Sequence, residues 1–288
     1  MSLIELRSGG ARVTIDTERG GRLASWTARG RELLVGPPTP DDRSIRWGCF
    51  LMVPWAGRLA SGRFELAGTT VQVPRTHGRH AIHGLAWAER WQVDAAASDG
   101  ATLSLDLARA GWPMGGRVTE TIQLWGDRLV LEAEIEADRP MPAAMGWHPW
   151  FRRDGEVRLR VDADATLETR GMLPTGTVTP VTRRTDLRRG PALADRRLDD
   201  AYVDARSPVI ASWDDLELAI AFKPSPATVI VFTPPGSFCV EPQTAWPNSF
   251  SLSAERSARA GHAELGAGER LRIAMELALR FEARPAGT

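Results

Sequence analysis

The amino-acid sequence predicts an all-β fold built from antiparallel sheets. Three observations predict it. Apolar and polar residues alternate with a period of two in several segments, and turn signals separate those segments. No stretch of about twelve residues shows the 3.6-residue apolar period of an amphipathic helix. Because successive side chains of a strand point to opposite faces of its sheet, alternation places one face on a core and the other toward water. Many short strands separated by turns favour an antiparallel sandwich or barrel.

The expected strands follow one another along the whole chain. In order, they cover residues 64–66, 70–73, 103–107, 122–125, 129–135, 157–161, 209–213, 216–222, 238–240 and 271–281. Three dipeptides are expected to close hairpins between neighbouring strands: Ala67-Gly68, Gly126-Asp127 and Asp214-Asp215. The last strand is the clearest, since every odd position from Leu271 to Phe281 is apolar.

Composition and charge limit the classes of protein that the chain can represent. Lys and Arg total 36 and Asp and Glu total 36, so no net charge argues for a nucleic-acid or membrane-surface partner. Hydrophobic residues make up 43% and charged residues 25%, as in an ordinary globular domain. With no composition break or repeat, we expect residues 1–288 to form one domain. The Pro- and Arg-rich residues 174–191 are expected to be a surface excursion.

The two cysteines and the N-terminal residues favour a cytoplasmic protein. Cys49 and Cys239 are too few and too far apart for a disulfide framework or a metal motif, so we interpret them as reduced core thiols. Glu5 and Arg7 precede any apolar stretch, which argues against a secretory signal. The apolar runs are far shorter than the roughly 18 residues of a membrane helix. We expect a monomer or homodimer that acts on a small molecule.

Four segments are dense in aromatic and polar side chains. They cover residues 52–59, 77–87, 145–151 and 238–247, and they hold five of the eleven tryptophans: Trp55, Trp87, Trp147, Trp150 and Trp246. Tryptophan faces stack on the C–H faces of sugar rings, and neighbouring Arg, His, Glu and Gln side chains can bind hydroxyls. This combination predicts a carbohydrate site. The alternative is that these tryptophans fill the interior, since Trp is buried on average.

Each polar residue also has an ordinary structural explanation. His77, His80 and His83 have the spacing H-x-x-H-x-x-H, but the segment is loop-like and has no acidic or thiol partner nearby, so we expect no metal. His148 precedes a proline, and a hydrogen-bonded core imidazole would explain it equally well. Glu241 follows a buried strand, where a carboxylate is costly unless it is functional or paired with an arginine.

Taken together, the motifs resemble those of the aldose 1-epimerase (galactose mutarotase) family. In chain order they are Pro54-Trp55-Ala56-Gly57-Arg58, Ile82-His83-Gly84, Gly146-Trp147-His148-Pro149-Trp150-Phe151, Leu198-Asp199-Asp200-Ala201-Tyr202 and Val240-Glu241-Pro242-Gln243-Thr244. The resemblance runs from about Arg22 to the C-terminal strand. It implies a galactose-mutarotase-like β-supersandwich of antiparallel sheets.

The resemblance also implies which residues act. It places His83 and His148 at the ring oxygen of a sugar and Glu241 at the anomeric hydroxyl. The implied substrate-binding residues are Arg58, Asp199, Gln243 and Trp147. The sequence departs from the family pattern at Leu85, where glycine is common, and at Asp200, where histidine is common. The choice between Asp199 and Asp200 stays open, with Asp199 favoured because Tyr202 then takes the aromatic position.

The implied reaction explains these residue types. Interconverting α and β anomers requires one group to remove the C1 hydroxyl proton and another to protonate the ring oxygen, with no cofactor and no metal. A glutamate can serve as the base, and a histidine with an ordinary pKa near 6.5 keeps a charged fraction that can serve as the acid. We therefore expect Glu241 as base and His148 as acid. Alternatives are a hexose-6-phosphate 1-epimerase, a non-catalytic carbohydrate-binding protein, and a lyase on the same fold.

Overall fold

The predicted all-β class is confirmed by the structure, a computed structural model that describes residues 3–39, 42–194, 196–252 and 259–282. Strands dominate these residues, and the 3-10 helices η1 (Ala60–Gly62), η2 (Ala86–Ala88) and η3 (Ser249–Ser251) are single turns. No helix in the described ranges has the length and apolar character needed to cross a membrane.

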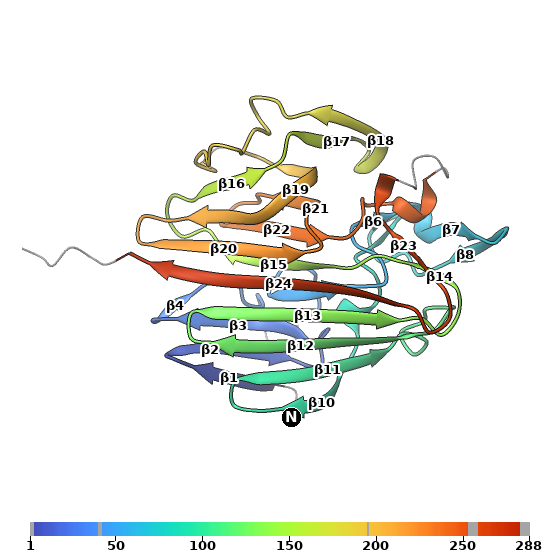
Figure 1. The fold of residues 1–288 in the computed structure, drawn as a ribbon, viewed down its shortest axis with the longest axis horizontal. Coiled ribbons are helices and arrows are strands. Elements are labelled where there is room, and N and C mark those ends of the chain that lie inside the picture. The colour runs from blue at the N-terminus through green and yellow to red at the C-terminus, as the bar shows by residue number, and fades with distance from the viewer. Residues whose placement is uncertain (1–2, 40–41, 195, 253–258, 283–288) are drawn as a thin grey trace, which may run out of the picture.

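Two large antiparallel sheets make up most of the molecule (Figure 1). The first sheet has the spatial order β1 (Leu3–Ser8), β2 (Ala11–Asp16), β3 (Arg22–Ala28), β5 (Cys49–Met52), β15 (Gly146–Arg152), β22 (Ser237–Gln243), β21 (Ala227–Phe232), β19 (Asp199–Ser212), β17 (Ala165–Arg170) and β18 (Leu173–Pro180). The short β4 (Arg31–Glu32) also pairs with β3.

The second sheet lies in front of the first in Figure 1. Its order is β10 (Gln92–Ala96), β11 (Gly100–Asp106), β12 (Arg117–Trp125), β13 (Arg128–Glu136), β24 (Arg270–Phe281), β20 (Leu216–Lys223), the end of β19, and β16 (Arg158–Asp162). Three small pairs complete the described strands: β6 (Arg58–Leu59) with β9 (Ala81–Ile82), β7 (Arg63–Leu66) with β8 (Thr69–Gln72), and β14 (Met141–Ala143) with β23 (Ala263–Leu265).

Strand β19 joins the two sheets. Its first residues, Asp199 to Tyr202, pair with β21 in the first sheet, and its last residues, Val209 to Ser212, pair with β20 in the second. The register shifts between Tyr202 and Ala205. A bulge of this kind bends a strand, which lets one chain segment serve two sheets.

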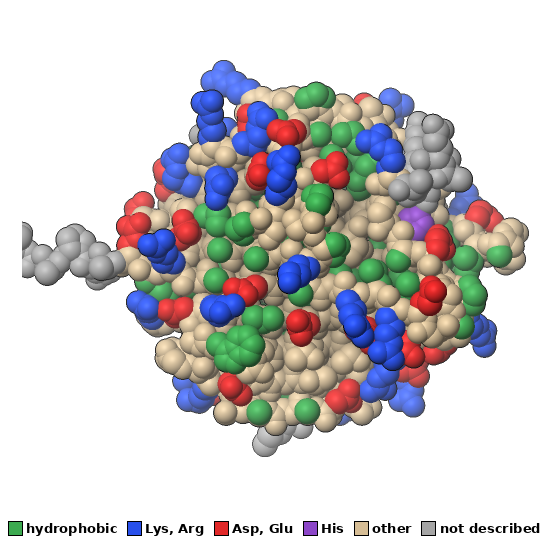
Figure 2. Space-filling view, in the orientation of Figure 1, with side chains coloured by type: hydrophobic (Ala, Val, Ile, Leu, Met, Phe, Trp, Pro, Cys, Tyr) green, Lys and Arg blue, Asp and Glu red, His purple; other side chains and the backbone are tan. Residues whose placement is uncertain are grey.

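The main core lies between the sheets and is built by the alternation seen in the sequence. In β24, Ile273, Met275, Leu277 and Leu279 are buried, while the residues between them are only partly covered. The first sheet contributes side chains such as Leu51 to the same core. Each fully buried side chain of this size contributes about 1.5–3 kcal/mol of hydrophobic free energy. On the outer face of the second sheet, acidic and basic side chains are interspersed (Figure 2), as the balanced composition predicts.

The structure corrects one expectation. Residues 174–191 were expected to be a surface excursion, but their first part belongs to β18, which pairs with β17. Pro174 and Pro180 obscured the strand in the sequence. They are tolerated because β18, which pairs with β17 alone among the described strands, lies at the edge of the first sheet, where prolines are accepted. The predicted hairpins at Ala67-Gly68 and Gly126-Asp127 are confirmed.

Candidate active site

His148 and Glu241 face each other on neighbouring strands of the first sheet. The pairs Gly146↔Gln243 and Trp150↔Cys239 join β15 to β22, and this register puts position 148 opposite position 241. The His148 Nε2 atom lies 3.3 Å from Glu241 Oε1. Both side chains are buried, at 3% exposure each. Two residues far apart in the sequence therefore form one acid–base pair.

Aromatic rings fix the orientation of the His148 imidazole. Strand alternation puts Trp150 on the same face as His148, and the β5–β15 register pairs His148 with Phe50. The imidazole stacks on Phe50 at 5.0 Å between ring centroids and on Trp150 at 5.2 Å. These rings belong to a small apolar cluster, separate from the main core, that also contains Met52 and Cys239. The pair therefore lies on the face of the first sheet that is turned away from the second.

A tight loop after β9 brings His83 to the same place. The His83 N–H group donates to the Gly57 carbonyl at 2.9 Å. The next residue, Gly84, has φ +73°, and a Cβ atom there would lie 1.9 Å from the Val53 carbonyl oxygen. Only glycine allows this approach. The His83 ring stands nearly perpendicular to that of His148, at 4.9 Å and 85°.

Arg58 and Asp199 lie within electrostatic range of this pair. Arg58 pairs with Ile82 on the short β6–β9 ladder, one residue before His83. Asp199 begins β19 and continues a row across the sheet through Phe232 and Cys239. Desolvation raises the pKa of Asp199, and the Arg58 guanidinium opposes this rise, as it does for Glu241. The Arg58 Nε atom is buried and has no hydrogen-bond partner, so it is free to donate to a ligand.

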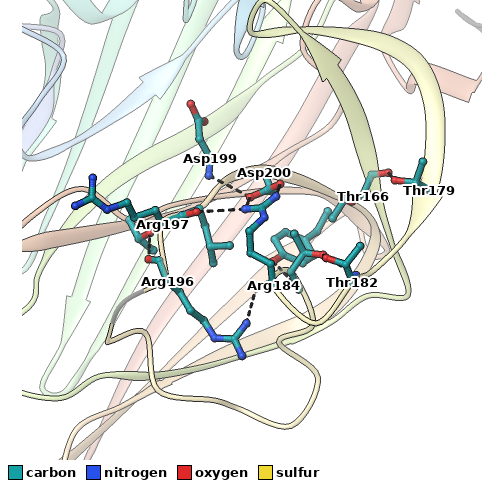
Figure 3. A network of polar contacts seen from close by, with 12 residues as sticks. Thr166, Thr179, Thr182, Arg184, Arg196, Arg197, Asp199 and Asp200 are labelled. Carbon is teal, nitrogen blue, oxygen red and sulfur yellow. Dashed lines mark hydrogen bonds and ion pairs between the residues drawn. The ribbon is translucent and has the colours of Figure 1, made fainter.

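Asp200 is held in an ion pair with Arg184 that lies away from the Asp199 carboxylate (Figure 3). Two guanidinium nitrogens of Arg184 donate to the Asp200 carboxylate, at 2.7 and 2.6 Å. The Asp199 N–H group donates to Asp200 at 3.2 Å, whereas the Asp199 carboxylate extends away from this network in Figure 3. Asp199 is thus the acidic residue of the two whose carboxylate is available to a ligand. Arg196 donates to the carbonyls of Arg183 and Arg184 and holds the same loop.

Gln243 lies near the pair, and Trp147 does not. Gln243 follows Glu241 by two positions, so it shares its face, and its amide nitrogen donates to the Ala245 carbonyl at 2.6 Å. The amide oxygen is buried without a partner. Trp147 points to the opposite face of β15, is 1% exposed, and donates its indole N–H to Glu120 at 2.7 Å. The expected contact between Trp147 and a substrate is therefore contradicted, because strand alternation turns it into the main core.

Burial shifts the pKa values of the pair in opposite directions. Desolvation raises the pKa of Glu241 well above its ordinary value, Asp199 raises it further, and Arg58 opposes the shift. Desolvation lowers the pKa of His148 to about 3 and that of His83 well below its usual range. At neutral pH the imidazoles are thus uncharged, and burial favours the protonated form of the Glu241 carboxyl. The expected charged fraction of His148 is wrong, because the depth of its burial cannot be read from the chain alone.

Two buried ionisable residues were missed in the sequence. Arg22 is 1% exposed, its guanidinium lies 5.0 Å from the Phe50 ring, and burial lowers its pKa to about 10. It donates to four backbone carbonyls, those of Arg19, Ser44, Trp47 and Trp87. Nothing in the sequence distinguishes Arg22 from the other Lys and Arg residues, which total 36. Glu120 does have a signal, because it occupies an inward position between Val118 and Ile122.

The three histidines of the H-x-x-H-x-x-H segment do not converge. His80 accepts a hydrogen bond at Nδ1 from the Ser61 N–H group at 3.1 Å. His83 alone of the three joins a group of potential metal ligands in the described chain, and its partners there are His148 and Glu241. The spacing of the histidines in the sequence therefore did not predict their grouping in space.

A sequence profile of the aldose 1-epimerase family matches residues 2–278, and the chain belongs to this family. It is 25% identical over 167 residues to the uncharacterized protein YphB of Escherichia coli K12 and 31% identical over 156 residues to the uncharacterized protein YihR of the same bacterium. The matches cover 56% and 49% of those proteins, so the chain spans about half the length of each.

Solved structures share the whole fold. A putative aldose 1-epimerase from Escherichia coli K12 superimposes with a TM-score of 0.84 at 19% identity, covering 97% of this chain and 99% of the other. A GalM/aldose epimerase homologue from C. elegans gives a TM-score of 0.85 at 19% identity, covering 97% and 98%. The predicted galactose-mutarotase-like architecture is confirmed.

Proposed function

We propose that the protein is an aldose 1-epimerase that interconverts the α and β anomers of free aldohexoses. The observation that carries the proposal is the 3.3 Å contact between His148 Nε2 and Glu241 Oε1, with His83 beside it, in a chain of this family. Two proton-transfer groups that lie side by side can act on the C1 hydroxyl and on the ring oxygen of a sugar while the bond between C1 and the ring oxygen breaks and re-forms.

The reaction begins with one proton on the pair. In the free site this proton lies on Glu241, and its transfer to His148 across the 3.3 Å contact gives a carboxylate and an imidazolium. The carboxylate removes the proton of the C1 hydroxyl as the bond between C1 and the ring oxygen breaks. The imidazolium protonates the ring oxygen, which leaves an open-chain aldehyde. Rotation about C1–C2 and the reverse transfers close the ring on its other face.

The surrounding residues bind and orient the sugar. Arg58 donates to sugar hydroxyls through its guanidinium, which presents several N–H groups in a fixed plane. Asp199 accepts from hydroxyls, because its carboxylate carries no ion pair in the described chain. Trp150 and Phe50 hold the His148 ring at the ring oxygen. His83 donates a second hydrogen bond there, and Gln243 supports the position of the β22 end.

The proposal is tested by following the anomer ratio of freshly dissolved α-glucose and α-galactose by NMR. Glu241→Gln should lower the catalysed rate by about 10²–10⁴-fold, the usual contribution of a positioned proton transfer. Glu120→Gln is the matched control, because it removes another buried carboxylate that lies in the main core. We expect this control to keep its rate.

Three outcomes would contradict the proposal. The first is a folded Glu241→Gln variant with the wild-type rate. The second is a wild-type protein that binds sugar without accelerating anomer exchange, as a non-catalytic carbohydrate-binding protein would. The third is turnover of glucose 6-phosphate without turnover of glucose or galactose, as a sugar-phosphate epimerase would show.

A further inference from the structure

The group His83, His148 and Glu241 has the composition of a transition-metal site. One ligand atom from each residue lies within 4.8 Å of the others, and all three side chains are buried. Two imidazoles with one carboxylate are a recurrent donor set for Zn²⁺ and related ions. Within the described ranges, no other group of His, Cys, Asp and Glu has this arrangement.

We propose that this group binds a divalent transition metal, with Zn²⁺ as the preferred ion, and that the bound ion inhibits the enzyme. The binding stands on the geometry alone. The inhibition rests on the proposed function, since it requires that His148 and Glu241 carry protons to and from the sugar.

The spacing of the pair already suits a bound ion. Two ligand atoms about 2.0–2.1 Å from a tetrahedral Zn²⁺ lie about 3.3 Å apart. The His148 Nε2 and Glu241 Oε1 atoms are 3.3 Å apart. The His83 ligand atom needs to move by at most about 1.6 Å toward this pair to complete three-fold coordination. A water molecule or a sugar hydroxyl would occupy the fourth position.

The surroundings favour an inhibitory ion of moderate affinity over a tightly held one. In high-affinity sites the second nitrogen of each ligating histidine donates to a carboxylate, carbonyl or water, and losing this partner costs about 10–100-fold in affinity. Here the Nδ1 atom of His148, whose Nε2 atom faces Glu241, is buried without a hydrogen-bond partner. We therefore expect dissociation constants in the micromolar range, where an ion competes with the sugar for the same atoms.

Metal binding can be measured without activity. Co²⁺ is added to the full chain without an affinity tag, its visible absorption bands are recorded, and Zn²⁺ is then titrated in to displace it. We expect one equivalent of Co²⁺ per chain in the wild type. His83→Gln and Glu241→Gln should each weaken binding at least tenfold. His77→Gln is the matched control, because it removes a histidine of the same segment that lies outside the group.

The outcomes separate this inference from the proposed function. If one equivalent of Zn²⁺ lowers the rate of anomer exchange at least tenfold and a chelator restores it, both proposals are supported. Stoichiometric Co²⁺ binding without any anomer exchange would support the metal site and overturn the proposed function. Normal exchange that Zn²⁺ leaves unchanged would overturn the inhibition. Co²⁺ bands that are missing in the wild type, persist in both site variants or disappear in His77→Gln would overturn the metal site.

Discussion

The Glu241 carboxyl and the His148 imidazole are 3.3 Å apart, and the same burial moves their pKa values in opposite directions. Burial disfavours the charged form of each group, so the pKa of the acid rises and that of the base falls. The pair consequently holds a single proton from about pH 3 up to the raised pKa of Glu241. This relationship sets the expected pH dependence of the reaction.

We expect kcat/KM to show no inflection near the ordinary histidine pKa of about 6.5. A second proton enters the pair only near pH 3, where His148 titrates, and would remove the base. At high pH the raised pKa of Glu241 is passed, the pair loses its one proton, and the acid disappears. Activity should therefore be level from above about pH 3 until the pH passes the raised pKa of Glu241, and should fall beyond it. Rates of anomer exchange across the pH range, corrected for the spontaneous reaction, provide the measurement.

If kcat/KM instead fell to half its maximum near pH 6.5 on the acid side, the assignment of one shared proton to the pair would be contradicted. Such a profile would show that His148 titrates as an exposed imidazole does. His77→Gln serves as a control here too. A pH profile that changes in this variant would show that the limb arises outside the pair.

Glu120 should make the folded state less stable as the pH rises from about 4.5 to about 7. Desolvation raises the pKa of this core carboxyl to about 7, against the Trp147 hydrogen bond that lowers it. Between the ordinary glutamate pKa and about 7, the unfolded chain has lost a proton that the folded chain keeps. The free energy of unfolding therefore falls with rising pH across this window, and the contribution is complete below it.

Glu120→Gln should reduce this slope, by an amount on the order of 1–3 kcal/mol between about pH 5 and pH 8. Glu241 contributes with the same sign, so part of the slope remains. Thermal denaturation at the two pH values measures the effect, and the exposed Glu156→Gln variant is the control. A slope that is identical in wild type and Glu120→Gln would contradict the raised pKa.

Gly84→Ala should disrupt both the fold and the site. A Cβ atom at this position would lie 1.9 Å from the Val53 carbonyl oxygen, so the loop that carries His83 must move. We expect a loss of more than about 3 kcal/mol, since backbone strain and steric overlap add. Thermal denaturation and the rate of anomer exchange are the measurements.

Gly126→Ala is the matched control for this change. Gly126 also has a positive φ, +57°, but a Cβ atom there would meet nothing within 4 Å. It should therefore cost only the conformational penalty, about 1–2 kcal/mol, and leave activity unchanged. Equal effects of the two substitutions would show that the close approach to Val53 does not position His83.

Much of the architecture could be predicted from the chain because strand alternation is a local property. The burial pattern of β24 follows its apolar positions, and the hairpin at Gly126-Asp127 follows from its turn residues. The edge strand β18 was not predicted because its prolines are residues that disfavour strands, and this too is a local property of the sequence. Five motifs that occur in the same order as in the aldose 1-epimerase family also led us to expect His83, His148 and Glu241 at one site.

Only the tertiary structure decided what depends on distance and burial. The register of β15 against β22 brings Glu241 to His148, and alternation along β15 removes Trp147 from their face. The ion pair of Asp200 with Arg184, the buried Arg22 and the uncharged state of His148 all arise from contacts between distant segments. Sequence patterns report which side chains are apolar or polar, whereas desolvation and pairing exist only once the sheets have assembled.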